Sequence, residues 1–366
     1  MKNKILEICK AFQISGTFYK MEEIHSGHIN STFRVYFTVG ENLNEYIVQK
    51  VNTNVFVRPV EMMENISSVT EFIREKLERE GADVRRFVMQ YLSVADGRYY
   101  HVRENGEFWR CCRFIENSVS FLNPENTKVV EESGVAFGAF QKYLYDYPVD
   151  KLHIVIPHFH NTIMRYGAFR EAIKADLVGR KSGIEDVIAG YFSLEEVATE
   201  PYKMQRRGEL PLRVTHNDTK ISNVLFDLET YEHLSVIDLD TVMPGLVAFD
   251  FGDAIRIAGN TGEEDERDLA RVALDMEKYE AFTRGFLKEV RGFLTENEKK
   301  SLPLGAVAMT VECGVRFLTD YLNGDTYFKT HYSDQNLVRA KCHLALAKDM
   351  LRRFEEMQEI VEKYCQ

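Results

Sequence analysis

The chain lacks several features that mark large protein classes. Its six cysteines have neither the density of a disulfide framework nor the spacing of a metal site: Cys9, Cys111, Cys112, Cys313, Cys342 and Cys365. Residues 1–12 do not form a secretion leader, and no later apolar stretch approaches membrane-spanning length. Internal repeats and low-complexity linkers are also missing. We therefore expect a cytoplasmic protein without a membrane partner.

Basic residues are in the minority. The chain has 46 Lys and Arg against 57 Asp and Glu, a formal net charge of −11. This balance argues against nonspecific binding to nucleic acid or to an anionic membrane. The chain has 366 residues and is 45% hydrophobic, which is enough for two cores. The composition leaves the oligomeric state open.

One segment, residues 214–226, carries most of the chemistry. The spacing of His216, Asp218 and Asn223 matches the catalytic loop of protein kinases, in which the Asp accepts a hydroxyl proton and the Asn holds magnesium. Lys220 follows Asp218 closely enough to stabilise the charge of a transferring phosphoryl group, and we expect His216 to support the loop. The segment therefore predicts phosphoryl transfer with a nucleotide and magnesium.

A second magnesium ligand is expected after this loop. Two short apolar segments between Val224 and Asp238 predict a hairpin that returns Asp238 to the catalytic loop. Asp250 begins an Asp-Phe-Gly tripeptide, which carries the magnesium Asp in protein kinases, but a further loop separates it from Asn223. We therefore expect Asp238 to bind the metal and Asp250 to brace the catalytic loop.

The order of the elements predicts an α+β fold with two lobes. Strand signals dominate residues 24–115, interrupted by a helical pattern over residues 61–81. Helical patterns dominate later, over residues 129–145, 162–177, 279–290 and after 333, with a capping box at Thr295–Glu298. We expect a small sheet lobe with one helix, residues 1–115, and a larger, mainly helical catalytic and acceptor-binding lobe, residues 116–366. This is the bilobal plan of protein kinases.

Three strings extend the kinase pattern to a particular family. They are His-Asn-Asp-Thr-Lys-x-x-Asn-Val-Leu from His216, Val-Ile-Asp-Leu-Asp-Thr-Val-Met-Pro-Gly from Val236, and Phe-Asp-Phe-Gly-Asp-Ala-Ile-Arg from Phe249. They resemble the aminoglycoside phosphotransferase-like superfamily, and most closely its N-acetylhexosamine 1-kinase group, along nearly the whole chain. The resemblance implies phosphorylation of the anomeric hydroxyl of an N-acetylhexosamine with ATP and magnesium. The roles of Asp240 and Asp253 stay open.

The resemblance also implies a nucleotide site in the first third. Residues 25–37 resemble the family's phosphate-covering hairpin, with Gly27 and Asn30 at the turn. Lys50, at the end of the next strand, stands where kinases place the lysine that pairs with the nucleotide phosphates. The helix over residues 61–81 should supply its carboxylate partner, for which Glu64 is favoured over Glu61 and Glu71.

The edge of the expected sheet predicts where adenine binds. Residues 87–92 and 108–115 are predicted as further strands that complete the sheet. The chain leaves the sheet at Phe114, Ile115 and Glu116. We expect these three residues to form the hinge whose backbone groups contact adenine.

Two segments could contact the acceptor. Residues 312–328 resemble the C-terminal signature of the hexosamine kinases, which implies sugar contacts from Arg316 and Tyr327, although the same segment also reads as a buried helix and a turn. Residues 157–165 offer His160 and Arg165 near the acceptor, and for them a surface or helix-end role is equally favoured.

The sequence therefore predicts an ATP- and magnesium-dependent kinase with a small-molecule acceptor, most closely an N-acetylhexosamine. Two alternatives stay open. One is a kinase for choline, homoserine, an aminoglycoside or another sugar. The other is a nucleotide-binding regulator without catalysis, against which the retention of Asp218, Asn223 and Asp238 argues. Whether ATP or another nucleotide is the donor also stays open.

Overall fold

A five-stranded antiparallel sheet lies at the N-terminal end of the protein. The computed structural model describes residues 1–25 and 29–366. The strand order is β1-β2-β3-β5-β4. The strands are β1 (Thr17–Ile24), β2 (Ser31–Val39), β3 (Asn42–Val51), β4 (His101–Val102) and β5 (Phe108–Arg113). Strand β1 pairs with β2, so that Ile24 lies opposite Thr32, as expected for a hairpin over this segment.

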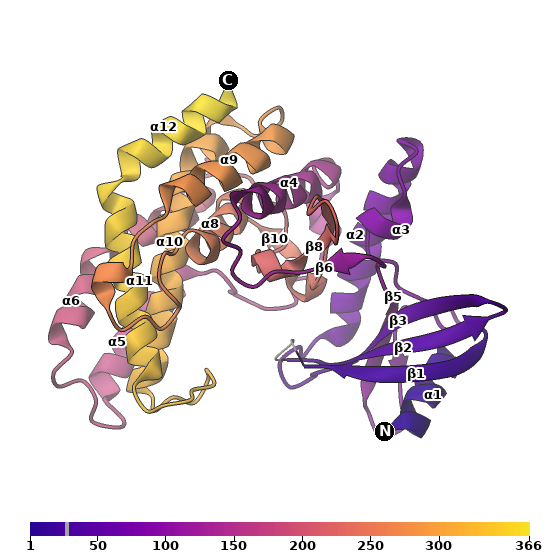
Figure 1. Ribbon diagram of the computed structural model, residues 1–366. Helices are drawn as coiled ribbons and strands as arrows, with labels where there is room; N and C mark the ends of the chain where they lie inside the picture. The colour runs from indigo at the N-terminus through magenta and orange to yellow at the C-terminus, as the bar shows by residue number, and fades with distance from the viewer. Residues whose placement is uncertain (26–28) are drawn as a thin grey trace.

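Helices cover both faces of this sheet. Because side chains alternate along β5, Trp109 and Cys111 face α1 (Lys2–Ala11), while Phe108 belongs to the cluster of α2 (Pro59–Arg79). The sequence predicted α2 but not α1, which the lobe carries in addition. Figure 1 shows α1 beside the sheet near the N-terminus and α2 between the sheet and the rest of the molecule.

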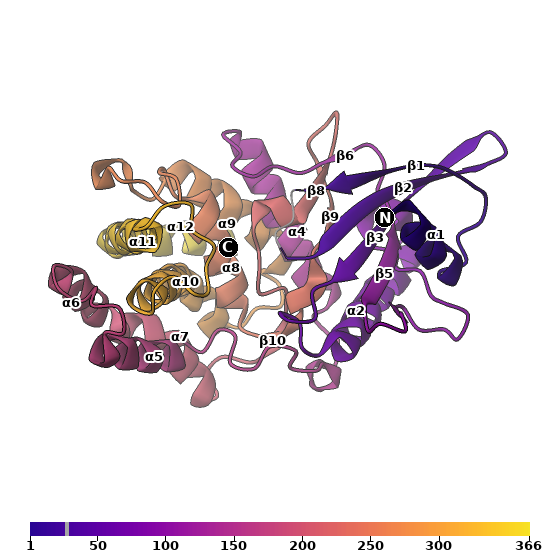
Figure 2. The same ribbon diagram turned by 90° about the horizontal axis from the view of Figure 1, so that it is seen from below.

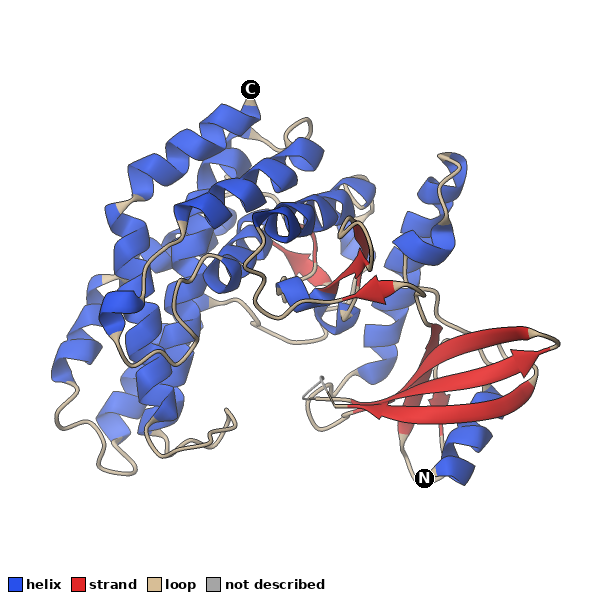
Figure 3. Cartoon of the chain, in the orientation of Figure 1, coloured by secondary structure: helices blue, strands red, loops and turns tan. Residues whose placement is uncertain are grey.

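The second part of the chain is mainly helical. Figures 2 and 3 show the strands of the sheet at one end and the long helices at the other. The helices are α4 (Thr127–Tyr143), α5 (Thr162–Ala175), α6 (Glu185–Ser193), α7 (Glu195–Arg206), α8 (Val247–Ala258), α9 (Met276–Val290), α10 (Glu296–Leu322), α11 (Gln335–Arg352) and α12 (Phe354–Cys365). The expected bilobal α+β fold is confirmed.

Short strands and single 3-10 turns lie between the longer elements of the chain. The strands form two small antiparallel sheets: β7 (Arg213–Thr215) with β10 (Met243–Gly245), and β6 (Ser118–Val119) with β8 (Val224–Asp227) and β9 (His233–Val236). The 3-10 turns are η1 (Val149–Lys151), η2 (Ile221–Asn223), η3 (Leu239–Thr241) and η4 (Leu269–Arg271). The predicted hairpin before Asp238 is confirmed as β8 and β9.

The apolar core continues from the sheet part into the helical part. On α2, Met62, Ile66 and Ile73 pack in one cluster with Val214 and Leu239, which flank the predicted catalytic segments. A separate, larger cluster joins α4, α5 and α8–α12. Helix α2 therefore holds the sheet against the predicted catalytic loop. The predicted division at residue 115 falls between β5 and β6 and stays a prediction.

Three local predictions from the sequence are wrong. Residues 87–92 are not a strand: α3 (Val84–Phe87) begins where Asp83 accepts a hydrogen bond from the Arg85 N–H, and Tyr91 makes an isolated bridge to Cys112. The last helical stripe is broken at Arg353 into α11 and α12.

The third concerns membrane-spanning length. Helix α10 is long and apolar enough to cross a membrane by length and composition, although 78% of its apolar window is buried inside the protein. A buried core helix meets the same two criteria. The capping box predicted at its start is confirmed, because Thr295 and Glu298 bond reciprocally to each other's backbone N–H.

Candidate active site

The predicted catalytic loop runs from β7 to β8 and is fixed by His216. This side chain is fully buried. Its Nε2 lies 2.8 Å from the Ile237 carbonyl oxygen, and its Nδ1 lies 3.2 Å from the Asp218 N–H nitrogen. Since a carbonyl only accepts and an N–H only donates, Nε2 carries the proton and Nδ1 accepts. His216 therefore supports the loop, as predicted, and is too enclosed to contact an acceptor.

Asp218 lies at the solvent-accessible tip of the loop with two polar neighbours. The Lys220 Nζ lies 2.9 Å from the Asp218 Oδ2. The Asn223 amide donates to the Asp218 carbonyl at 2.8 Å and to Oδ2 at 3.2 Å. Burial opposes the charge of Lys220, but the carboxylate of Asp218 outweighs it and raises the pKa of Lys220. The three residues predicted from the loop are thus brought together.

Asp238 comes directly after the hairpin and lies next to Asn223. The Ile237 N–H donates to the Asn223 carbonyl at 2.9 Å, so the two strands bring the segments together. Asp238 itself adopts a left-handed backbone, φ 59° and ψ 53°, which Asp tolerates better than most residues. Crowding by protein atoms raises the pKa of Asp238 to about 6, and the charges of Asp240 and Asp218 act in the same direction, although solvent reaches the side chain.

These residues fit a magnesium site. The described residues contain no group of three His, Cys, Asp or Glu side chains placed to hold a metal ion. Magnesium, however, is commonly held by one or two carboxylates together with phosphate oxygens and water. The Asn223 amide nitrogen is used within the loop, which leaves its oxygen for a cation beside the Asp238 carboxylate. A cation there would also offset the mutual repulsion of Asp218, Asp238 and Asp240.

Asp250 braces the catalytic loop from α8, as predicted. Its two carboxylate oxygens accept the backbone N–H groups of His216 at 2.8 Å and Asn217 at 2.7 Å. Gln141 donates to it from α4 at 2.8 Å. Asp250 is buried, which raises its pKa against the opposing effect of these donors. Both of its carboxylate oxygens are therefore engaged by protein donors, two of them backbone N–H groups of the loop.

Lys50 does not pair with Glu64, which corrects the prediction. Its Nζ lies 3.0 Å from the Glu107 Oε1, just before β5, and Glu64 instead lies 2.9 Å from the His153 Nε2. Of the alternatives, Glu61 faces Arg58, the residue before α2, and Glu71 faces Arg74 of the same helix. The side chain of Lys50 follows the neighbouring strand, whereas these three acids of α2 point elsewhere, and sequence cannot set that rotation.

Asn30 links the predicted phosphate-covering hairpin to the segment that carries Asp238. Its amide donates to the Asp240 Oδ2 at 2.9 Å, and its carbonyl accepts the Asn52 N–H at 2.9 Å. The other oxygen of Asp240 pairs with Arg110 of β5, and both side chains are almost fully buried. Gly27, the other residue predicted there, lies outside the described residues. The sequence analysis missed Arg110, although the second Asp of Ile-Asp-Leu-Asp pointed to a role for Asp240.

The predicted hinge has backbone groups available for a ligand. The Phe114 N–H donates to the Glu45 carbonyl at 3.0 Å, and the Ile115 carbonyl accepts the Ser118 hydroxyl at 2.6 Å. Within the described part of the chain, the N–H groups of Ile115 and Glu116 have no hydrogen-bond partner. The hinge can therefore offer two donors, and the Phe114 N–H is excluded.

On the acceptor side, Arg316 and Tyr327 lie together. The Arg316 guanidinium carbon lies 5.8 Å from the centre of the Tyr327 ring and 5.3 Å from that of Phe328. Asp320 accepts the N–H groups of Tyr327 and Phe328, at 2.8 and 2.9 Å, and so shapes the turn after α10. Tyr327 is 72% exposed and can move to meet a ligand.

Of the other two predicted acceptor contacts, Arg165 lies near Arg316, whereas His160 is enclosed by protein. Arg165 donates to the Phe159 carbonyl at 2.8 Å, and the charge of Arg316 is near enough to contribute, after burial, to a lowered pKa of Arg165. His160 is enclosed, because its Nε2 lies 3.1 Å from the Asn217 carbonyl and its Nδ1 lies 3.1 Å from Glu312 Oε1. With both ring nitrogens engaged, His160 is not a substrate contact, and that prediction is corrected.

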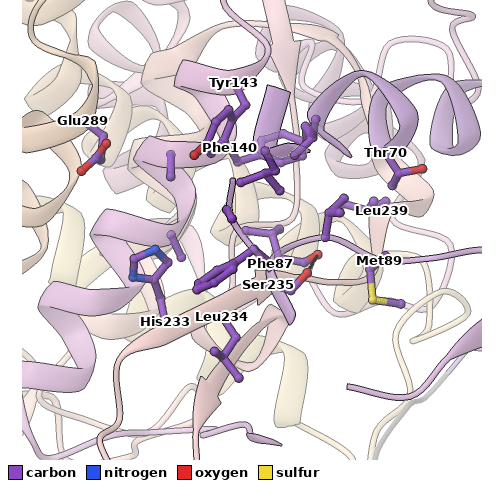
Figure 4. A pocket seen from close by; sticks show the side chains of 17 residues that line it. Thr70, Phe87, Met89, Phe140, Tyr143, His233, Leu234, Ser235, Leu239 and Glu289 are labelled. Carbon is purple, nitrogen blue, oxygen red and sulfur yellow. Dashed lines mark hydrogen bonds between the residues drawn. The ribbon is translucent and has the colours of Figure 1, made fainter. Parts of the chain in front are cut away.

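A cavity of about 250 Å³ lies elsewhere, between α2, α4 and β9. Figure 4 shows Thr70 of α2, Phe140 and Tyr143 of α4 and Ser235 of β9 around it. None of the predicted site residues is among the described residues that form its walls. This cavity and the catalytic motif are therefore separate, and the predicted chemistry belongs to the motif.

Comparisons with known proteins identify the family of the chain. A two-part fold with His216, Asp218, Asn223 and Asp238 at its junction defines the class of kinase-like phosphotransferases. The model of the phosphotransferase enzyme family matches residues 20–286. The chain belongs to this family.

Solved structures of similar fold are distant in sequence. An aminoglycoside phosphotransferase from Alicyclobacillus acidocaldarius is 11% identical with a TM-score of 0.62, over 93% of this chain and 92% of that one. A choline kinase from Cryptosporidium parvum is 13% identical with a TM-score of 0.58, over 100% and 99%. A spectinomycin phosphotransferase solved with ADP and its antibiotic is 13% identical with a TM-score of 0.52, over 99% and 98%. These likenesses support the fold, and the family supports a small-molecule kinase.

Proposed function

We propose that the protein is an ATP- and magnesium-dependent kinase that phosphorylates the anomeric hydroxyl of an N-acetylhexosamine. The observation that carries the phosphoryl-transfer part is the arrangement of Asp218 with Lys220 and Asn223, to which the hairpin returns Asp238. These residue types supply a base, a cation and two oxygen ligands for a metal. A regulator without catalysis would have no chemical need for all of them.

The chain's own residues divide the reaction between them. Asp218 orients the acceptor hydroxyl and takes its proton while the acceptor oxygen bonds to the γ-phosphorus of ATP and the bond from that phosphorus to the departing ADP breaks. Lys220, held 2.9 Å from Asp218, lies where it can stabilise the negative charge of the transferred group. Asn223 and Asp238 would hold the metal, which would supply positive charge against the phosphate oxygens. His216 and Asp250 fix the loop so that little reorganisation is needed during the reaction.

The nucleotide part rests on the sheet. Lys50 and Asn30 come from the strand and the hairpin that would cover the phosphates, and the hinge offers the N–H groups of Ile115 and Glu116 to adenine. In the similar spectinomycin phosphotransferase, ADP is the bound nucleotide. Lys50 would exchange Glu107 for a phosphate, because a highly charged polyphosphate attracts an exposed ammonium more strongly than a single carboxylate does.

The charges on the acceptor side support an uncharged acceptor. Two acids there are already paired: Glu312 faces His160, and Asp253 is bound by Arg256 at 2.7 Å. A third, Asp320, is occupied by the N–H groups of Tyr327 and Phe328. Among the described residues, Arg165 and Arg316 have no carboxylate within ion-pair distance. Two guanidinium groups without a carboxylate partner repel cationic acceptors such as choline or an aminoglycoside, while their N–H groups can donate hydrogen bonds to hydroxyl and amide oxygens. An N-acetylated sugar matches this donor set.

The test is turnover by the purified protein with ATP and magnesium on a panel of acceptors. The panel contains N-acetylglucosamine, N-acetylgalactosamine, free hexoses, choline, homoserine and an aminoglycoside. Phosphorus NMR identifies each product. An anomeric phosphate formed from the N-acetylhexosamines alone would support the proposal. Preferred turnover of choline or an aminoglycoside would refute the charge argument but keep the kinase. Nucleotide binding without turnover of any acceptor would favour the regulator.

A further inference from the structure

His160 occupies an unusual place for a residue outside the catalytic motif. It precedes α5 and reaches under the catalytic loop, where its side chain is 10% exposed. One ring nitrogen lies 3.1 Å from the carbonyl oxygen of Asn217, the residue before Asp218. The other lies 3.1 Å from the Glu312 Oε1 of α10. The rings of Phe159 and Phe249 pack against it.

The partners of His160 decide its protonation. A peptide carbonyl can only accept a hydrogen bond, and so can an ionised carboxylate. The second oxygen of Glu312 accepts a hydrogen bond from the Thr162 hydroxyl at 2.5 Å, so each carboxylate oxygen has one donor. Both ring nitrogens of His160 must then donate, which requires the imidazolium. Burial alone would lower the pKa of His160, but the hydrogen bond and charge of Glu312 outweigh it and raise the pKa.

We propose that His160 is a positioning residue for phosphoryl transfer: as an imidazolium clamped between Glu312 and the Asn217 carbonyl, it sets the orientation of the peptide that carries Asp218. The proposal rests on the kinase activity of this site and not on the identity of the acceptor.

The clamp completes the fixation of that peptide. Asn217 has a left-handed backbone with φ 65°, and its N–H is held by Asp250 at 2.7 Å. The carbonyl of the same residue is held by His160. The N–H of Asn217 is thus bound from α8, and its carbonyl is bound by His160 of the segment before α5, which Glu312 of α10 holds in turn. The side chain of Asp218 therefore projects from a fixed peptide. Arg316 lies one turn after Glu312, so the same helix carries the predicted acceptor contact.

The balance of charge around His160 is favourable to a cation. Glu312 is the nearest acid, and Asp253 of α8 adds a smaller attraction. The charged groups nearest to it on the elements packed around it are, on α10, Glu312 and Arg316; on α8, Asp250, Asp253 and Arg256; on α5, Arg165; and in the catalytic loop, Asp218 and Lys220, which pair with each other. Arg256 is neutralised by Asp253, which leaves Glu312 as the group that keeps the imidazolium protonated.

The decisive variant is Glu312→Gln, which keeps the size of the side chain and removes its charge. In the wild-type protein, NMR of the labelled imidazole should show His160 titrating above its ordinary value of 6.5. In Glu312→Gln the titration should move to lower pH, and the alkaline limb of the kcat profile should move with it, measured on whichever acceptor is turned over. A purely structural role of Glu312 would lower kcat at every pH without moving that limb.

His160→Gln provides the complementary test. This variant should lower kcat by about 10- to 100-fold, because a displacement of the catalytic carboxylate by up to about 1 Å has an effect of this order. The KM for ATP should change little. His233→Gln is the matched control, because His233 also pairs with a glutamate, Glu132 at 2.8 Å, away from the loop. It should keep the wild-type profile.

Two results would overturn the proposal. A wild-type His160 that titrates at or below 6.5 removes the imidazolium, and this NMR result does not depend on any acceptor. A Glu312→Gln variant whose alkaline limb stays in place removes the link to catalysis. Failure of every acceptor to react would instead refute the proposed function, and the NMR titration would still decide the protonation of His160.

Discussion

Loss of Arg110 should destabilise the protein far more than loss of a surface arginine. Arg110 and Asp240 form an ion pair in which the side chains are 2% and 3% exposed. Arg110 also donates to Gln49 at 2.9 Å, and Asp240 accepts from Asn30. The pair joins β5 of the sheet to the turn η3 that follows Asp238. Asp240 raises the pKa of Arg110 against burial, so the guanidinium stays charged.

The expected magnitude follows from what remains after the substitution. In Arg110→Met, the carboxylate of Asp240 stays buried without its cation. Removing one partner of a buried ion pair typically costs about 3–5 kcal/mol of the free energy of unfolding. In Arg79→Met, which breaks a pair exposed by 73% and 51% on α2, the cost should stay below about 1 kcal/mol. The difference between these two variants isolates the effect of burial.

The protein carries its own probe for this measurement. Its single tryptophan, Trp109, precedes Arg110 and is 1% exposed in the sheet core. Urea unfolding followed by tryptophan fluorescence therefore reports on β5 directly. Adding Asp240→Asn to Arg110→Met removes the stranded charge, so the double variant should be more stable than the sum of the single losses predicts, by about 0.5–3 kcal/mol.

Two outcomes would refute the reasoning. If Arg110→Met unfolds at the same urea concentration as Arg79→Met, the buried pair is not what holds the sheet to η3. If the losses of the single variants simply add in the double variant, Arg110 and Asp240 stabilise the protein independently, and the charge pairing has no energetic consequence.

Two further predictions concern catalysis and pH. Asp218→Asn should lower kcat by about 10²- to 10⁴-fold while calorimetry shows unchanged nucleotide affinity, and unchanged turnover would remove the base assignment. Burial, and after it the charge of Arg256, lowers the pKa of His343 from 6.5 to about 4. The unfolded chain therefore binds a proton at His343 more readily than the folded protein does. The contribution of neutral His343 to stability is complete above pH 6.5 and is lost progressively as the pH falls from 6.5 to about 4. The share of His343 is the difference between the wild-type protein and His343→Leu: from urea unfolding at both pH values, the free energy of unfolding of the wild-type protein should change by roughly 2 kcal/mol less favourably between pH 7 and pH 5 than that of the variant.

The catalytic segments were predictable because their functional residues are close together in the sequence. His216, Asp218 and Asn223 lie within one loop, and a single hairpin returns Asp238, so spacing alone brings them together. Helix α2 was found from its apolar spacing, and α10 from its capping box. Contacts between distant segments were not predictable in this way. Spacing says nothing of how α2 is rotated, and Lys50 meets Glu107 of the neighbouring strand instead of Glu64.

Strand propensity also gave a wrong prediction where tertiary contacts determine the local structure. Residues 87–92 are rich in the apolar and aromatic residues that favour strands, yet one isolated bridge from Tyr91 is the pairing that the structure gives this segment. His160 shows the same limit for function. Sequence placed it near the acceptor, but not beneath the loop, because the proximity of Glu312 and the Asn217 carbonyl is a property of packed helices.

The orientation of the catalytic groups depends on three contacts from outside the motif. Asp250 holds the loop from α8, His160 holds it from the side of α10, and Asn30 with Arg110 holds the turn after Asp238 from the sheet. The first two lie within the helical part, so they persist whatever the sheet does. The third crosses between the two parts, so movement of the sheet would shift Asp238 relative to Asp218. Metal binding is therefore the step that should respond to closure of the two parts, while the base remains in place.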